Sequence, residues 1–128
     1  MYIVLDVMDK KKTLIIGATP NPARYAYLAA HRLVDAGHKI VNIGIKKGEV
    51  AGVAIQPAGD PLPDIHSITL YIGPQTQPLY YDYIIHTKPQ RLIFNPGTEN
   101  PELEARAQAA GIDTIQACTL VLLSTNQY

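Results

Sequence analysis

The sequence has no tryptophan, a single phenylalanine and a single cysteine among its 128 residues. Because Cys118 has no second cysteine to pair with, an intramolecular disulfide framework is excluded, and we expect a protein of the reducing cytoplasm. An excess of charge is lacking too, since 11 Lys and Arg residues balance 11 Asp and Glu residues. A chain without net charge has no overall field for nucleic acid or an anionic membrane, so any anion site must be local.

Long apolar runs and catalytic groupings are also missing. No apolar stretch approaches the roughly 20 residues that a membrane-spanning helix needs, so we expect no membrane partner. The serines form no nucleophile elbow, and no Cys/His metal pattern is present. The histidines fall in separate expected elements without paired spacing: His31, His38, His66 and His86. The sequence therefore favours a protein without a metal and without a complete catalytic constellation.

What is present is an alternation of apolar strands and amphipathic helices in one domain, residues 1–128, with a core from about 12 to 125. Strands are expected at 13–16, 40–43, 67–72, 91–94 and 114–118. Helices are expected at 22–36, at 78–87, and from 101 to just before Gly111. This alternation predicts an α/β domain of three layers, a Rossmann-like fold with five parallel strands and helices on both faces of the sheet.

Several segments leave alternatives open. Residues 2–8 fit either an added edge strand or a short helix, and residues 120–123 fit either a helix or a strand. Residues 53–55 form at most a short strand ahead of a proline-rich loop. The tyrosines within residues 80–83 cannot all face the sheet from one helix, because adjacent helical positions point apart. Together with the apolar ends of the chain, they suggest a homodimer surface.

The segment from Lys12 to Arg24 has the features of a phosphate-binding turn. A buried strand is followed by Gly17, which suits a sharp turn or close approach by a ligand, and Asn21-Pro22 is expected to open a helix. Free N–H groups and the helix dipole at such a place favour an anion. Thr19 stands where the dinucleotide fingerprint G-x-G-x-x-G has its second glycine, so the segment indicates a nucleotide phosphate and disfavours NAD.

Glycines also follow four of the expected strands, at Gly17, Gly44, Gly73 and Gly97. Loops after strands often contain glycine for turn geometry alone. However, ligands in open α/β sheets bind at the carboxyl ends of the strands, where these glycines fall. The pattern therefore favours a ligand crevice at that edge of the sheet.

The end of the second strand discriminates between nucleotides. An NAD site needs a carboxylate about 20 residues after the glycine turn, to hold the ribose hydroxyls. This chain has Lys46 and Lys47 instead, which either attract the additional phosphate of NADP or CoA or form a solvated loop pair. Arg24 is either a bidentate phosphate ligand or a plain exposed arginine.

Five segments of the sequence resemble the CoA-binding domain family, small Rossmann-like proteins similar to the CoA-binding domain of the succinyl-CoA synthetase alpha subunit. The segments are Gly17–Pro22, Gly44–Glu49, Thr69–Ile72, Phe94–Glu102 and Ala117–Leu120. The resemblance implies a five-stranded parallel sheet with CoA across its carboxyl edge. It places residues 17–21 at the CoA phosphates, 43–47 near the adenosine and its 3′-phosphate, 71–74 beside the nucleotide, and 95–99 with Cys118 toward the pantetheine.

Together with Arg24, the resemblance gives the following expected cofactor-binding residues: Gly17, Ala18, Thr19, Pro20, Asn21, Arg24, Ile43, Lys46, Lys47, Tyr71, Ile72, Gly73, Pro74, Asn95, Pro96, Gly97 and Cys118.

The expected function is a stand-alone module that binds CoA or an acyl-CoA without catalysis. The second domain, which carries the synthetase's phosphorylated histidine, has no counterpart in this sequence, so the resemblance extends to binding and not to catalysis. One alternative is an NADP-binding regulator or reductase relic of the same fold. Another is a thiol-redox protein that uses Cys118 beside the CoA thiol, although Cys118 also fits a buried, inert thiol. Glu99 is either a base near Gly97 or a surface charge.

Overall fold

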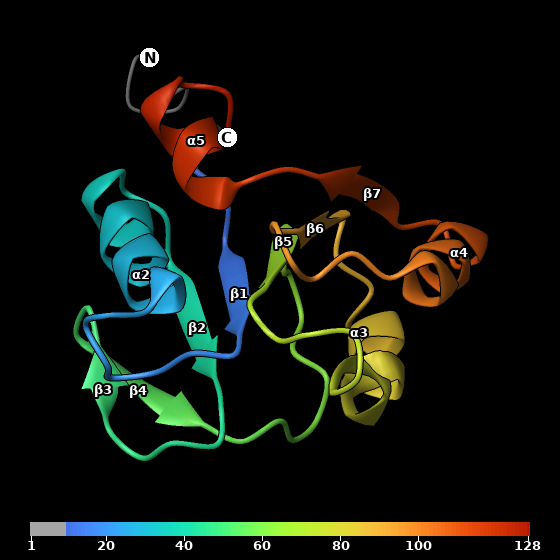
Figure 1. Cartoon of the computed structure of the whole chain (residues 1–128), viewed down its shortest axis with the longest axis horizontal. Helices are drawn as coiled ribbons and strands as arrows, with labels where there is room; N and C mark the ends of the chain where they lie inside the picture. The colour runs from blue at the N-terminus through green and yellow to red at the C-terminus, as the bar shows by residue number, and fades with distance from the viewer. Residues whose placement is uncertain (1–9) are drawn as a thin grey trace.

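A computed structural model of the chain describes residues 10–128 (Figure 1). The alternatives for residues 2–8 lie outside this range. All five strands expected from the sequence are present: β1 (Thr13–Ile16), β2 (Ile40–Ile43), β5 (Ser67–Leu70), β6 (Arg91–Phe94) and β7 (Asp113–Gln116). They pair in parallel as β2-β1-β5-β6-β7, with β5 and β7 each ending two residues earlier than expected.

The expectation of a five-stranded, wholly parallel sheet is wrong, because the sheet has seven strands. Strand β4 (Val53–Gln56) pairs in parallel with β2, and β3 (Glu49–Val50) pairs antiparallel with β4 at the edge. The turn between them consists of Ala51 and Gly52, with φ of 54° and 80°. Two positive φ values are typical of the tightest hairpin turns, and alanine at the first position is an uncommon residue there. The hairpin therefore has no Asn-Gly or Asp-Gly signal in the sequence.

Helices cover both faces of the sheet, which confirms the three-layer α/β architecture (Figure 1). On one face, Leu14 and Ile16 pack with side chains of α3 (Tyr81–Thr87) and α4 (Pro101–Ala109). On the other face, Ile15 packs with Ala30 and Leu33 of α2 (Tyr25–Asp35) and reaches the hydrophobic cluster that includes Leu123 of α5 (Thr119–Ser124). The alternation of side chains along β1 thus supplies both hydrophobic cores.

The two Asn-Pro pairs behave differently, which corrects one expected helix start. Asn100 caps α4, because its Oδ1 accepts hydrogen bonds from the N–H groups of Glu102 and Leu103 at 3.1 and 3.2 Å. Asn21 instead accepts from the N–H of Ala23 at 3.0 Å, which closes a turn before the helix. Helix α2 therefore begins at Tyr25, three residues later than Pro22, with Arg24 at its N-cap.

The structure decides between the alternatives that the sequence left open for the helices and strands of residues 10–128. The C-terminal apolar residues form helix α5. The helix expected from Pro78 begins as a 3-10 turn, η1 (Gln77–Tyr80), and continues as α3. Tyr81 and Tyr83 are buried and Tyr80 is half-buried, so these tyrosines leave little surface for a homodimer, which stays an untested expectation. Among residues 10–128, no helix has the length and apolar character needed to cross a membrane.

Candidate functional site

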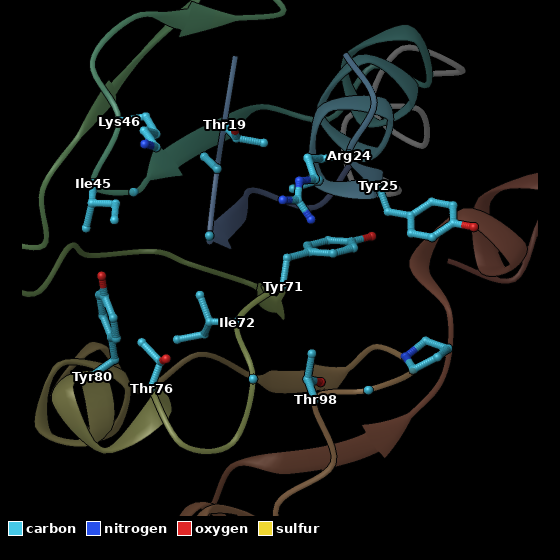
Figure 2. A pocket seen from close by; sticks show the side chains of 17 residues that line it. Thr19, Arg24, Tyr25, Ile45, Lys46, Tyr71, Ile72, Thr76, Tyr80 and Thr98 are labelled. Atoms are coloured by element: carbon cyan, nitrogen blue, oxygen red, sulfur yellow. The ribbon is translucent and has the colours of Figure 1, made fainter. Parts of the chain in front are cut away.

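A cavity of about 460 Å³ opens at the carboxyl edge of the parallel strands (Figure 2). Its volume is within the range of small-molecule sites. The loops after β1, β2, β5 and β6 all contribute to its wall, as the glycine pattern predicted, and the first turn of α2 and η1 complete it. The lining residues are Gly17, Ala18, Thr19, Arg24, Tyr25, Ala26, Gly44, Ile45, Lys46, Tyr71, Ile72, Gly73, Thr76, Tyr80, Pro96, Gly97 and Thr98.

Two glycines let three of these loops approach one another closely. Gly17 has φ of +99°, and a Cβ built on it would lie 2.9 Å from the backbone carbonyl of Tyr71. A Cβ on Gly44 would lie 2.4 Å from the carbonyl oxygen of Ala18. Both distances are shorter than a carbon atom tolerates, so glycine is needed at each position for steric reasons. The cavity exists in this shape because these backbones are in contact.

Three N–H groups of the first loop already have partners within the protein. The N–H groups of Gly17 and Ala18 both donate to the carbonyl of Ile43, at 2.9 Å. The N–H of Asn21 is also used, by Thr19 Oγ1 at 3.2 Å. The first turn of α2 is better suited to an anion, because a helix leaves its first N–H groups without intrahelical partners and Tyr25 and Ala26 line the cavity.

Within the part of the chain that the structure describes, Arg24 and Lys46 are the charged residues of the lining, which includes no Asp, Glu, His or Cys. Arg24 extends from the N-cap of α2 toward Tyr71, and Lys46 lies beside Ile45 at one end of the pocket (Figure 2). Lys47, the other lysine of the pair, does not line the cavity. A protein of zero net charge thus has a locally cationic cavity, as an anion site requires.

Tyr71 forms part of the floor between the loops. Its phenolic oxygen is buried and has no hydrogen-bond partner among residues 10–128, and burial raises the pKa of Tyr71 to about 12. The hydroxyl is therefore neutral at physiological pH. Tyr71 contributes an uncharged aromatic surface to the cavity and no acid or base chemistry.

Asn95 was expected to contact the ligand, but its side chain is buried and hydrogen-bonded within the protein. Its Nδ2 donates to Thr69 Oγ1 at 2.6 Å and to the carbonyl of Leu70 at 2.8 Å. Its Oδ1 accepts from the N–H of Thr119 at 2.8 Å. The side chain therefore joins the ends of β5 and β6 to the start of α5, and it does not line the cavity.

Gln77 joins the loops after β5 and β6, which both form part of the cavity wall. This fully buried side chain donates through Nε2 to the carbonyls of Ile72 and Thr98, at 3.0 and 2.7 Å. Its Oε1 accepts from Asn100 Nδ2 at 2.9 Å. Ile72 and Thr98 are both lining residues, so one amide holds two parts of the wall at a fixed separation.

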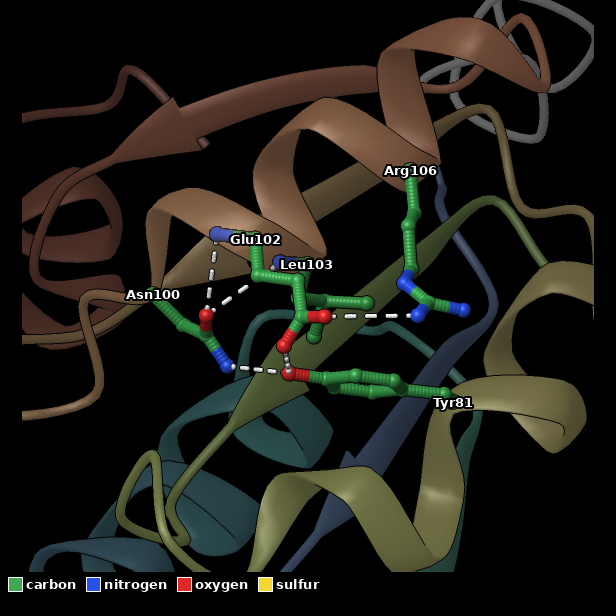
Figure 3. A network of polar contacts seen from close by, with 5 residues as sticks. All are labelled: Tyr81, Asn100, Glu102, Leu103 and Arg106. Atoms are coloured by element: carbon green, nitrogen blue, oxygen red, sulfur yellow. Dashed lines mark hydrogen bonds and ion pairs between the residues drawn. The ribbon is translucent and has the colours of Figure 1, made fainter.

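Asn100 extends this arrangement into α3 and α4 (Figure 3). Its Nδ2 also donates to the Tyr81 hydroxyl at 2.8 Å, and that hydroxyl donates to Glu102 Oε1 at 3.2 Å. Glu102 in turn pairs with Arg106 at 3.3 Å. The polar network fixes the wall to two helices and leaves the cavity with a preformed shape.

Several expected site residues lie outside the cavity lining: Pro20, Asn21, Ile43, Lys47, Pro74, Asn95 and Cys118. Cys118 is half-buried at the N-cap of α5, beyond the residues that form the pocket wall. Glu99 is used by its own loop, since its Oε1 accepts from the N–H of Gly97 at 2.9 Å. The other expected residues line one cavity, and most of them lie in the loops that follow the strand ends.

The lining also includes residues outside the segments expected at the ligand: Tyr25, Ala26, Thr76 and Tyr80. Gly44, Ile45 and Thr98 line the cavity too, and they belong to the expected segments 43–47 and 95–99. Tyr80 belongs to the group of tyrosines within residues 80–83, but the sequence did not indicate which of these rings would point into the cavity. Tyr25 and Ala26 were missed because α2 was expected to begin at Pro22.

Comparisons with solved structures place this fold among small proteins of similar length. An uncharacterized protein is 50% identical with a TM-score of 0.91, over 93% of this chain and 98% of that one. A hypothetical protein from Pyrococcus horikoshii OT3 is 25% identical with a TM-score of 0.83, over 97% and 89%. A Thermus thermophilus protein at 16% identity and a TM-score of 0.80 covers 99% of this chain and 97% of its own length, and shows the fold alone.

A search of curated proteins gives no match. A family model described as "CoA binding domain" matches residues 11–124, the same part of the chain that carries the resemblance found in the sequence. Since the match includes every strand and nearly all of the helical residues described above, the chain belongs to the CoA-binding domain family.

Proposed function

We propose that this protein binds CoA, free or as an acyl-CoA, in the cavity at the carboxyl edge of the sheet, as a module without catalysis of its own. The observation that supports this most is the joint presence of Arg24 and Lys46 in a cavity whose lining, among residues 10–128, includes no Asp or Glu. CoA needs such a site, because it carries a diphosphate and a separate 3′-phosphate. Family membership supports the same ligand.

The proposed contacts follow the order of the lining residues along the cavity. Arg24 and the first turn of α2 bind the diphosphate, through a guanidinium and through free N–H groups. Lys46 binds the 3′-phosphate of the ribose. Residues 71–73 flank the nucleotide, and residues 96–98 contact the pantetheine arm. These three residues are uncharged, as suits a neutral amide chain.

The absence of catalysis is proposed from the side chains at the cavity. Among the lining residues, the ionisable groups are Arg24, Lys46 and three tyrosines, and none of them is a general base near neutral pH. Cys118 would have to act from outside the lining. These residues bind and orient a ligand, and they offer no nucleophile to it.

The test compares the affinities of two lysine variants that differ by one position. Lys46→Ala is expected to raise the Kd for CoA about tenfold, the effect of losing one contact to a charged group. Its affinity for dephospho-CoA, which lacks the 3′-phosphate, is expected to stay at the wild-type value. Lys47→Ala is the matched control, because it removes the same charge one residue outside the lining. Isothermal titration calorimetry measures all six Kd values.

Other outcomes contradict specific parts of the proposal. Equal losses for CoA and dephospho-CoA would mean that Lys46 does not bind the 3′-phosphate. No binding of CoA by the wild type would contradict the function itself. Lys46 would also attract the 2′-phosphate of NADP, so a competition between NADPH and CoA belongs to the same experiment. Preference for NADPH would establish the NADP-binding regulator or reductase relic as the function.

A further inference from the structure

The end of the cavity near Lys46 combines a cation with apolar side chains that are unusually exposed. Ile45 is 87% exposed and Leu79 is 83% exposed. Ile45 lines the cavity, and Leu79 directly precedes Tyr80, which lines it from the other side. Figure 2 shows the side chains of Ile45 and Tyr80 pointing toward one another from opposite walls of the pocket. The hydroxyl end of the Tyr80 ring thus points at Ile45 across an open gap.

Such a gap suits a planar, mostly apolar group that carries a phosphate nearby. Exposed apolar surface at the edge of a cavity marks a contact for a ligand or partner. A purine base has two apolar faces, and aromatic side chains bind bases through those faces without regard to the base's hydrogen-bonding edge. Lys46 lies beside Ile45 at the same end of the pocket (Figure 2), so it is the cation that a phosphate on the adjoining ribose would meet.

Tyr80 is held in place before any ligand arrives. It is the last residue of η1 and directly precedes α3. The next residue, Tyr81, is buried and is fixed through its hydroxyl by Asn100 and Glu102. The start of η1 is fixed as well, because Gln77 is bonded to the carbonyls of Ile72 and Thr98. A side chain between two anchored neighbours loses little additional freedom on binding, which favours affinity.

We infer that Tyr80 is a specificity-determining residue of this site, against whose ring the adenine base of CoA packs, with Ile45 in contact with the edge of the base. This inference rests on the proposed function and adds to it the recognition of the nucleoside. Residue Tyr80 is outside the segments that the sequence assigned to the ligand. The part of the cavity that would hold the base is therefore formed by the loop after β2 and by the 3-10 turn η1, which are far apart in the sequence.

The test divides CoA into its two halves. Wild type, Tyr80→Ala and Tyr80→Phe are titrated with CoA, with adenosine 3′,5′-bisphosphate and with 4′-phosphopantetheine. Tyr80→Ala is expected to weaken CoA and the bisphosphate about tenfold and to leave 4′-phosphopantetheine unchanged, since only the first two contain adenine. Tyr80→Phe, which keeps the ring, is expected to retain the wild-type affinities. Gln75→Ala is the control, because Gln75 is an exposed residue of the same loop outside the lining.

The outcomes separate this inference from the function on which it rests. If the wild type binds CoA and Tyr80→Ala binds it equally well, Tyr80 does not contact the base and the inference is wrong. Equal losses for CoA and for 4′-phosphopantetheine would also overturn it, because they indicate a general disturbance of the cavity. If the wild type does not bind CoA, the proposed function fails and this inference fails with it.

Discussion

Gly44 illustrates how a single missing side chain determines the shape of the cavity. Replacement by alanine places a Cβ 2.4 Å from the carbonyl oxygen of Ala18, a backbone atom that cannot rotate away. The loops after β1 and β2 must then separate. We expect Gly44→Ala to reduce the free energy of unfolding by about 2 kcal/mol, as overpacking does, and to weaken ligand binding. Urea denaturation measures the first effect and titration with CoA the second.

Gly59→Ala is the control for this prediction. A Cβ on Gly59 would meet nothing within 4 Å, and Gly59 is exposed in a loop. Its replacement is expected to change the free energy of unfolding by no more than about 0.5 kcal/mol, as surface substitutions do. A Gly44→Ala variant as stable as Gly59→Ala would show that the two loops move apart freely, against the close contact in the structure.

At the residue scale, the sequence predicts side chains better than it predicts backbone donors. Lys46 was expected from its charge and its place after a strand, and Arg24 from its charge and its place in the first helix; both line the cavity. The N–H groups of Gly17 and Ala18 were expected to be free and are used by Ile43. Which carbonyl a loop N–H meets depends on the neighbouring strand's path, and no local pattern of residues encodes that path.

At the scale of elements, Gln77 determines how the loops after β5 and β6 are held. Gln77→Leu keeps the approximate size of the side chain and leaves the carbonyls of Ile72 and Thr98 and the Asn100 amide without this partner. Because unpaired buried polar groups cost about 1–3 kcal/mol each, we expect a loss of about 3 kcal/mol in the free energy of unfolding. We also expect weaker CoA binding, since both loops line the cavity. Chemical denaturation and calorimetry measure the two effects.

Gln75→Leu, in the same loop, is the comparison for Gln77→Leu. Gln75 is exposed, so the same change of amide to apolar side chain is expected to alter the free energy of unfolding by less than about 0.5 kcal/mol. If the two variants are equally stable, water replaces the Gln77 amide in full and the loops do not depend on it.

The elements that the sequence predicted correctly have strong local signals, and those it missed do not. The apolar runs of β1 and β6 and the Asn100 cap of α4 are each contained in a few residues. The β3–β4 hairpin depends on Ala51 in a conformation that alanine rarely adopts, at φ 54°. Its formation depends on pairing with β2, which is a tertiary contact. Similarly, Asn21 precedes a proline as Asn100 does, but it closes a turn ahead of α2 and is not the N-cap of that helix.

For the whole molecule, the edge of the sheet opposite the cavity has a separate polar cluster that makes stability depend on pH. His38 Nδ1 accepts a hydrogen bond from the N–H of Lys11 at 2.9 Å, and its ring lies 5.0 Å from that of Tyr128. The guanidinium carbon of Arg91 in turn lies over the Tyr128 ring, 4.3 Å from the centroid of that ring. Protonation of Nδ1 would remove the bond to Lys11 and place a second cation beside Arg91.

Burial, and after it the charges of Lys10, Lys11, Arg91 and His66, lower the pKa of His38 from 6.5 to about 4. The pKa of His66 is lowered as well, by burial and then by Arg91 and Lys11. The native state thus favours neutral imidazoles, whereas the unfolded chain takes up protons below about pH 6.5. The stabilisation is complete above that pH and is lost as the pH falls from about 6.5 to about 4.

We therefore expect the free energy of unfolding to fall by about 2 kcal/mol between pH 7 and pH 4 because of His38. In His38→Gln, whose amide does not titrate, the decline over this range is expected to be smaller by that amount. His86→Gln is the control, because His86 is exposed on α3, away from Arg91 and Tyr128. Urea denaturation at a series of pH values gives the three curves. Parallel curves for wild type and His38→Gln would mean that His38 is protonated in the native state without loss, contrary to its buried contact with Lys11. Because the cluster lies at the edge of the sheet away from Arg24 and Lys46, CoA affinity at pH 7 is expected to be equal in all three proteins, so a change in affinity would indicate coupling between the two edges of the sheet.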